Sequence, residues 1–159
     1  MNRRAPGGGL LHFVPLAAIA LLIANDHLLK PRYPGVLTGK LSDLAGLAFF
    51  PLFLQGLLEL CGLRRSDRVL RACVASTALV FTAVKTLPAA LHAYRFGLGA
   101  LQWPLRALLA AVHGAPLPDF APVAAVLDPT DLVALPMLAL ALWVRPPGGE
   151  TGARNSVVA

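Results

Sequence analysis

Polar and ionisable residues of this 159-residue sequence gather where long apolar stretches begin or end. Four such segments stand out: Asn25–His27, Thr38–Asp43, Lys85–Thr86 and Asp128–Asp131. Carboxylates in such positions can act as general bases, and lysines can stabilise negative charge. Because ionisable side chains are costly at membrane depth and usually mark functional positions there, these segments form the candidate site.

We expect the four segments to meet in one outward-facing polar pocket between helix ends. The ligand-binding candidates are Asn25, Asp26, Lys40, Ser42, Asp43, Lys85, Asp128 and Asp131. The catalytic candidates are Asp43, Lys85 and Asp131, with Asp26 as a further general base and Lys85 as the charge stabiliser. Lys85 should have a carboxylate partner, for which Asp43 is the first choice and Asp131 the second.

Each segment also has a purely structural explanation. Asp128, Pro129 and Asp131 make a good helix start, with an Asp cap, a proline at the first helical position and a second acid favoured by the helix dipole. Lys40 and Asp43 can pair on one helix face. Lys85 can extend to the membrane interface, and Asn25 with Asp26 can simply end a helix in water.

The composition indicates an integral membrane protein. Hydrophobic residues make up 57% of the chain and charged residues 14%, against about 25% charged in soluble domains. The net charge of +6 is therefore interpreted as a topology signal and not as a nucleic-acid surface. The expected partner is the lipid bilayer, nucleic acid is not expected, and protein partners are not indicated. No metal-ligand spacing is present, so we expect neither a metal nor a cofactor.

Apolar stretches predict an all-α transmembrane bundle in a single domain over residues 1–145, with four spans at about 10–29, 41–60, 69–91 and 128–144. Residues 146–159 form a polar tail that we expect to be disordered and cytoplasmic. The first 24 residues begin with arginines like a signal peptide. They lack a convincing small-x-small cleavage site, so we interpret them as part of the first span.

The segment at about 98–113 allows three interpretations. It is apolar but contains Gln102, Pro104 and Arg106. It can lie in the membrane interface as an amphipathic helix with Trp103 as an anchor, or it can re-enter the bilayer. A fifth span is the third interpretation. It would move the C-terminus, Asp128 and Asp131 to the other side of the membrane.

Basic residues predict the orientation of the four-span topology. One side would carry eight of them: Arg3, Arg4, Arg64, Arg65, Arg68, Arg71, Arg145 and Arg154. The other side would carry five: Lys30, Arg32, Lys40, Arg95 and Arg106. The positive-inside rule then places both termini in the cytoplasm of a cell whose inner membrane the chain crosses several times.

The segment Leu37–Pro51, with its Thr38–Gly46 core, resembles a motif of uncharacterised small bacterial inner-membrane proteins. Asn25–Lys30 and Asp128–Leu132 resemble parts of the same pattern. More distantly, the architecture is similar to that of VanZ-like proteins, which are small polytopic proteins with charged residues near helix ends. That second similarity is architectural and implies no residue roles.

Three functions fit these observations. The first is a binding or accessory membrane protein, whose pocket holds a polar headgroup or small polar ligand with Lys40 and Lys85 facing anionic groups. The second is a membrane-embedded enzyme acting on an outer-leaflet lipid or glycan carrier. The third is a structural subunit whose polar ends only cap and align its helices.

Overall fold

The computed structural model describes residues 7–144, and the regular elements in that range are all helical. The all-α prediction is confirmed, since the described residues contain no strand. Three helical stretches are long and apolar enough to cross a membrane: Phe13–Arg32, Val36–Leu60 and Asp67–Thr86. The predicted tail at 146–159 lies outside the described residues. The chain divides into two compact units, unit 1 with Met1–Ala78 and Ala134–Ala159, and unit 2 with Leu79–Val133.

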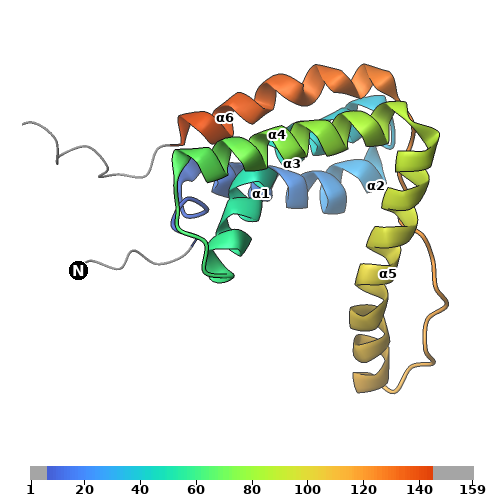
Figure 1. The fold of residues 1–159 in the computed structure, drawn as a ribbon. Coiled ribbons are helices and arrows are strands. Elements are labelled where there is room, and N and C mark those ends of the chain that lie inside the picture. The colour runs from blue at the N-terminus through green and yellow to red at the C-terminus, as the bar shows by residue number, and fades with distance from the viewer. Residues whose placement is uncertain (1–6, 145–159) are drawn as a thin grey trace, which may run out of the picture. The chain divides into compact units, whose positions relative to one another are not determined.

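Unit 1 is organised around an antiparallel helix pair (Figure 1). The first partner consists of α1 (Phe13–Ala24), a π-helical turn η1 (Asn25–Leu29) and the short α2 (Lys30–Arg32). The second is α3 (Val36–Leu60). Buried alanines on both helices, Ala18 on α1 and Ala45 and Ala48 on α3, keep the side chains between them small. Small residues let helix backbones approach closely in lipid, where no hydrophobic effect drives helices together.

The core of unit 1 lies toward the end of α3. Leu52 of α3 forms a buried cluster with Ala141 and Val144, which belong to or follow α6 (Leu138–Trp143). Partly buried apolar side chains pack against this cluster: Leu10, Val14, Leu70 and Val74. The last two come from the first half of α4 (Asp67–Thr86). Apolar packing therefore joins α3 to α6 and to the beginnings of α1 and α4.

The third predicted span ends earlier than the sequence indicated. α4 ends at Thr86, Leu87 is extended with φ −112° and ψ 118°, and a new helix α5 (Pro88–Val112) follows. Proline lacks the N–H needed inside a helix and disfavours the helical conformation of the residue before it, so Pro88 separates the two helices. The 20 residues of α4 still reach about 30 Å, enough for one bilayer crossing.

Unit 2 consists of the end of α4, the helix α5, a return segment at 114–128 and the residues up to Val133. The segment predicted at 98–113 is the second half of α5. The return segment runs back along α5 (Figure 1). Trp103 Nε1 donates to Pro118 O at 3.0 Å, and Arg95 Nε donates to Val123 O at 3.1 Å. These bonds fix an antiparallel pairing of helix and extended chain.

Gly99 lies at the closest approach between α5 and the return segment. A Cβ atom at this position would lie 2.8 Å from the carbonyl oxygen of Ala121 and 3.1 Å from Pro122 Cα. Both neighbours are backbone atoms, which cannot turn aside as a side chain can. The contact therefore requires glycine at position 99.

The last predicted span, at 128–144, consists of two consecutive helices of different types. A 3₁₀ helix η2 (Pro129–Met137) leads into the α-helix α6. Together they form a 15-residue apolar element, Pro129–Trp143, shorter than the three long helices.

Candidate functional site

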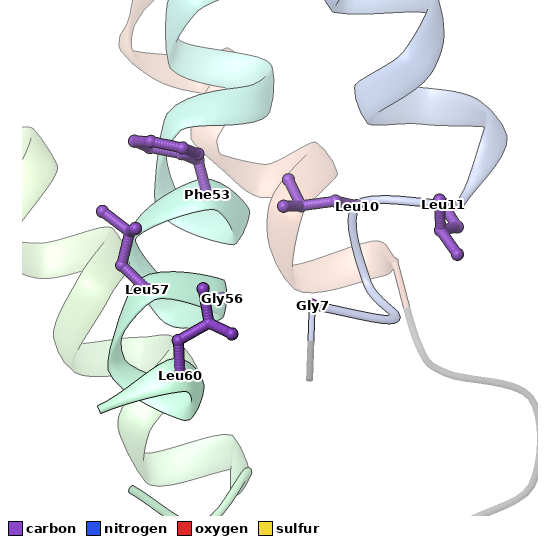
Figure 2. Close-up of a pocket in the computed structure, with 7 residues that line it drawn as sticks. All are labelled: Gly7, Leu10, Leu11, Phe53, Gly56, Leu57 and Leu60. Atoms are coloured by element: carbon purple, nitrogen blue, oxygen red, sulfur yellow. The ribbon is translucent and has the colours of Figure 1, made fainter. Parts of the chain in front are cut away.

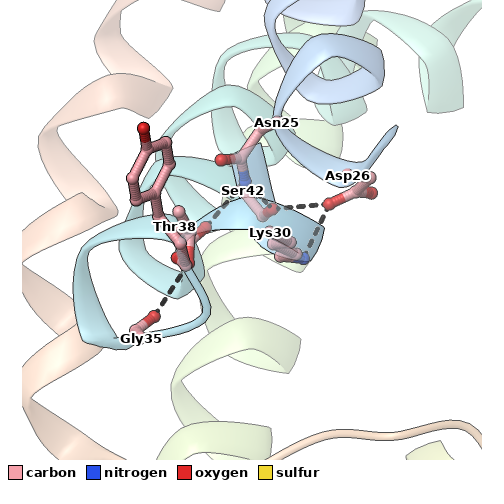
Figure 3. A network of polar contacts seen from close by, with 7 residues as sticks. Asn25, Asp26, Lys30, Gly35, Thr38 and Ser42 are labelled. Atoms are coloured by element: carbon pink, nitrogen blue, oxygen red, sulfur yellow. Dashed lines mark hydrogen bonds and ion pairs between the residues drawn. The ribbon is translucent and has the colours of Figure 1, made fainter. Parts of the chain in front are cut away.

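Five residues of unit 1 form a hydrogen-bonded group, here called the α1–α3 polar cluster: Asn25, Asp26, Lys30, Thr38 and Ser42. The first three lie at the C-terminal end of the first helical stretch, and the other two lie on the opening turns of α3 (Figure 3). The antiparallel pairing of the two helices brings these sequence segments together.

Asn25 is the centre of the α1–α3 polar cluster. Its side chain is 0% exposed, and its Nδ2 donates to Thr38 O and to Ser42 Oγ, both at 2.7 Å. Because a carbonyl oxygen only accepts, the Thr38 bond fixes which end of the amide faces α3. Within the described part of the chain, Asn25 Oδ1 is buried and has no hydrogen-bond partner. The amide therefore holds α1 to α3 through its nitrogen and keeps one acceptor unused.

Ser42 connects the buried amide to a charged pair. Its hydroxyl accepts from Asn25 Nδ2 and donates to Asp26 Oδ1 at 3.0 Å. Lys30 Nζ lies 2.6 Å from the same oxygen of Asp26. The Lys30 and Asp26 side chains are 40% and 44% exposed. The polar cluster thus leads from a buried amide outward to an accessible positive and negative charge.

Thr38 fixes the chain reversal between the two helices. Its hydroxyl lies 3.0 Å from Gly35 O and 3.2 Å from Tyr33 O, so its single hydrogen is shared between two carbonyls of the connecting turn. Its own carbonyl accepts from Asn25. Thr38 therefore couples the turn to the buried amide.

The π-helical turn at Asn25–Leu29 explains how the polar cluster is positioned. A π turn adds a residue to the helical repeat and rotates the following side chains relative to those before. Here it begins at the buried Asn25 and is followed by Lys30, whose backbone N–H returns to Asn25 O. Single π turns inside longer helices are frequent at functional sites. Nothing in the apolar pattern of the sequence predicted this turn.

A separate polar contact lies in unit 2. Lys85 Nζ is 2.6 Å from Asp131 Oδ2, with side-chain exposures of 14% and 10%. The ammonium also lies 5.5 Å from the centre of the Phe81 ring, one turn earlier on α4. The structure thus gives Lys85 the carboxylate partner that the sequence required, and Asp131 fills that role. An ion pair and an aromatic face are both recognised ways to stabilise a cation away from water.

Asp128 caps the beginning of η2. Its Oδ1 accepts from Thr130 N at 2.9 Å and from Thr130 Oγ1 at 2.7 Å, and its carbonyl accepts from Asp131 N. This matches the capping explanation of the sequence. The two carboxylates of this segment therefore differ in role, since Asp128 caps and Asp131 pairs with Lys85.

The remaining predicted residues, Lys40 and Asp43, lie on α3 on either side of Ser42 and are partly buried. Both take part in further polar interactions. The structure adds Lys30 and Thr38, which were not among the ligand-binding candidates named from the sequence. The sequence does contain a signal for Lys30: it lies four residues after Asp26, and oppositely charged residues at this spacing meet on one face of a helix. No group of three or more His, Cys, Asp or Glu residues in the described chain could hold a metal ion.

Comparison of the chain with protein-family models, with curated proteins and with solved structures gives no match. The interpretation of the site therefore depends on its own geometry.

Proposed function

We propose that this protein is a membrane-embedded binding protein whose α1–α3 polar cluster holds a polar headgroup or a small polar ligand. The observation that carries the proposal is Asn25, a fully buried amide with both N–H groups used and with no partner for Oδ1 among residues 7–144. A buried acceptor without a partner costs about 1–3 kcal/mol. An N–H or O–H of a ligand would recover that free energy once the side chains that cover Asn25 move aside, because the residue is 0% exposed.

The accessible pair beside Asn25 suggests the chemistry of the ligand. Lys30 can bind an anionic group such as a phosphate, and Asp26 can accept from an ammonium or hydroxyl group. A compact ligand with both kinds of group matches this arrangement, and phosphoethanolamine is the simplest probe. Ser42 keeps the Asp26 carboxylate in place, so the two charges are already ordered before the ligand arrives.

One observation favours the alternative of a membrane-embedded enzyme. Ser42 Oγ donates to a carboxylate, which is an arrangement that can activate a nucleophile. However, Lys30 occupies the same carboxylate oxygen, Oδ1, at 2.6 Å. An oxygen that already accepts from an ammonium and a hydroxyl is poorly available to remove a proton from Ser42. Binding without turnover is therefore the better-supported function.

A purely structural role predicts a different result. In that case the α1–α3 polar cluster would only join two helices, and added ligand would not change its stability. Titration of phosphoethanolamine into the purified chain in lipid nanodiscs, followed by calorimetry, separates the three functions. Saturable binding without a chemical product supports the proposal. Release of phosphate or ethanolamine would establish the enzyme, and no heat of binding would favour the structural subunit.

We also propose that the chain crosses a bacterial inner membrane four times with both termini in the cytoplasm. The proposal is supported by the three long apolar helices and the excess of basic residues on one side. The fourth crossing would be Pro129–Trp143. A 3₁₀ helix rises about 2 Å per residue, so η2 and α6 together would extend about 27 Å when straight, close to the hydrocarbon thickness of about 30 Å.

A further inference from the structure

Unit 1 has an apolar groove at the other end of the α1–α3 pair, away from the polar cluster. It lies between the residues leading into α1 and the last turns of α3, with a volume of about 270 Å³. Figure 2 shows Leu10 on one side and Phe53, Leu57 and Leu60 on the other. We propose that this groove binds one acyl chain of an anionic phospholipid, whose phosphate is held by the arginines that follow α3.

Glycines form the close contact in the groove. A Cβ at Gly56 would lie 3.3 Å from Leu10 Cδ1 and 3.5 Å from Gly7 Cα, so the two segments are already in van der Waals contact at this glycine. The side chains around these glycines are leucines and a phenylalanine, and Phe53, Leu57 and Leu60 are exposed. Such a mainly apolar surface on a membrane-spanning helix suits contact with hydrocarbon.

Glu59 connects Gly7, one of the residues that line the groove, to Arg65. Glu59 Oε2 accepts from Gly7 N at 2.9 Å, and Glu59 Oε1 lies 3.7 Å from Arg65 Nε. The Glu59 side chain is 8% exposed. The guanidinium of Arg65 also reaches Gly9, because a Cβ there would lie 2.9 Å from Arg65 Nη2. Arg65 therefore neutralises Glu59 and packs against Gly9 beside the groove.

Two further arginines supply charge for a phosphate. Arg64 and Arg68 are exposed and lie four and eight residues beyond Leu60, the last residue of α3 and part of the groove. The apolar groove and the excess positive charge are therefore adjacent along the chain. Basic residues beside transmembrane helices attract anionic lipid headgroups, which argues for a phospholipid with net negative charge as the occupant.

The test compares lipids with the same acyl chains and different headgroups. The delipidated full chain in detergent is titrated with phosphatidylglycerol, phosphatidylcholine or glycerol 1-phosphate, and thermal unfolding and native mass spectrometry report binding. Phosphatidylglycerol should bind and raise the unfolding midpoint more than phosphatidylcholine. Glycerol 1-phosphate, which has no acyl chain, should have no effect. Both lipids carry a phosphate and differ in net charge, so equal binding of the two would overturn the proposal that the groove selects an anionic phospholipid.

Two kinds of variant separate the headgroup from the acyl chain. Arg64→Gln with Arg68→Gln should weaken phosphatidylglycerol binding roughly 30-fold, since each cation near a membrane surface contributes about fivefold. Arg32→Gln with Arg106→Gln removes the same charge elsewhere and should have little effect. Leu57→Trp fills the groove without changing charge and should also weaken binding.

Circular dichroism and the unfolding midpoint without lipid show whether each variant is folded. Unchanged phosphatidylglycerol binding by a folded Leu57→Trp chain would contradict the groove as the acyl site. If the wild-type chain forms dimers and Leu57→Trp dissociates them, a second copy of the chain covers the groove. That result would also overturn the proposal.

Discussion

Lys85 Nζ and Asp131 Oδ2 lie 2.6 Å apart and join the end of α4 to the beginning of η2. The two residues are 46 positions apart in the sequence, and both side chains are largely buried. The pair is therefore a long-range polar link within unit 2.

Breaking this pair on one side should destabilise the protein. Lys85→Met leaves Asp131 buried without its cation, and the loss of one partner of a buried ion pair costs about 3–5 kcal/mol. Replacing both residues, as in Lys85→Met with Asp131→Leu, should recover most of this loss because no buried charge remains. Denaturant unfolding in detergent measures both effects, with Arg106→Met as an exposed control. A single variant as stable as the wild type would show that the pair contributes nothing.

Removing the hydroxyl of Ser42 should weaken the α1–α3 polar cluster. Ser42→Ala loses the bond from Asn25 and the bond to Asp26, so we expect a free energy of unfolding lower by about 1–2 kcal/mol. Ser76→Ala is the matched control, because within the described part of the chain the Ser76 hydroxyl bonds only to Cys73 O on its own helix. Equal effects of the two substitutions would mean that Ser42 has no special role between the helices.

A methyl group at position 99 should separate the return segment from α5. Gly99→Ala places a Cβ against backbone atoms of Ala121 and Pro122, and overpacking of this kind costs about 1–3 kcal/mol. Gly97→Ala, on the same helix with open space around it, should be neutral or slightly stabilising. Hydrogen exchange of the Val123 amide, which donates to Arg95 O, reports the contact directly. If exchange is as slow in Gly99→Ala as in Gly97→Ala, the tight approach is not needed.

The proposed topology has its own test. A reporter fused after Arg154 should give a cytoplasmic signal, and one inserted between Tyr33 and Val36 should give a periplasmic signal. A periplasmic C-terminal reporter would reject four crossings and would indicate that α5 or Pro129–Trp143 is placed differently in the membrane.

The sequence was informative wherever chemistry is local. Long apolar runs predicted the helices, and Asp128 with Pro129 predicted a helix cap that the structure contains. The prediction that Lys85 has a carboxylate partner followed from the free-energy cost of an unpaired charge in a membrane. Which carboxylate would supply it depended on tertiary packing, so the sequence alone could only rank Asp43 before Asp131.

Other features could not be predicted because they arise from contacts between distant segments. The π turn at Asn25–Leu29 leaves no periodic signal, since α1 before it is apolar on all sides and has no polar face whose position the rotation could shift. The end of α4 at Thr86 could have been predicted, because Pro88 marks a helix boundary. The span was instead extended to Leu91 because the residues up to that position are apolar. The role of Gly99 depends on the path of the return segment, which nothing local determines.

The α1–α3 polar cluster, as proposed here, binds a small polar ligand through Lys30. The most direct measurement is the Kd of phosphoethanolamine for the wild type, Lys30→Gln and Arg32→Gln in the same nanodiscs. A charge-assisted hydrogen bond contributes about 1.5–3 kcal/mol, so Lys30→Gln should raise Kd at least about tenfold while Arg32→Gln leaves it unchanged. Equal Kd values for the three chains, or no binding to the wild type, would contradict the proposed function.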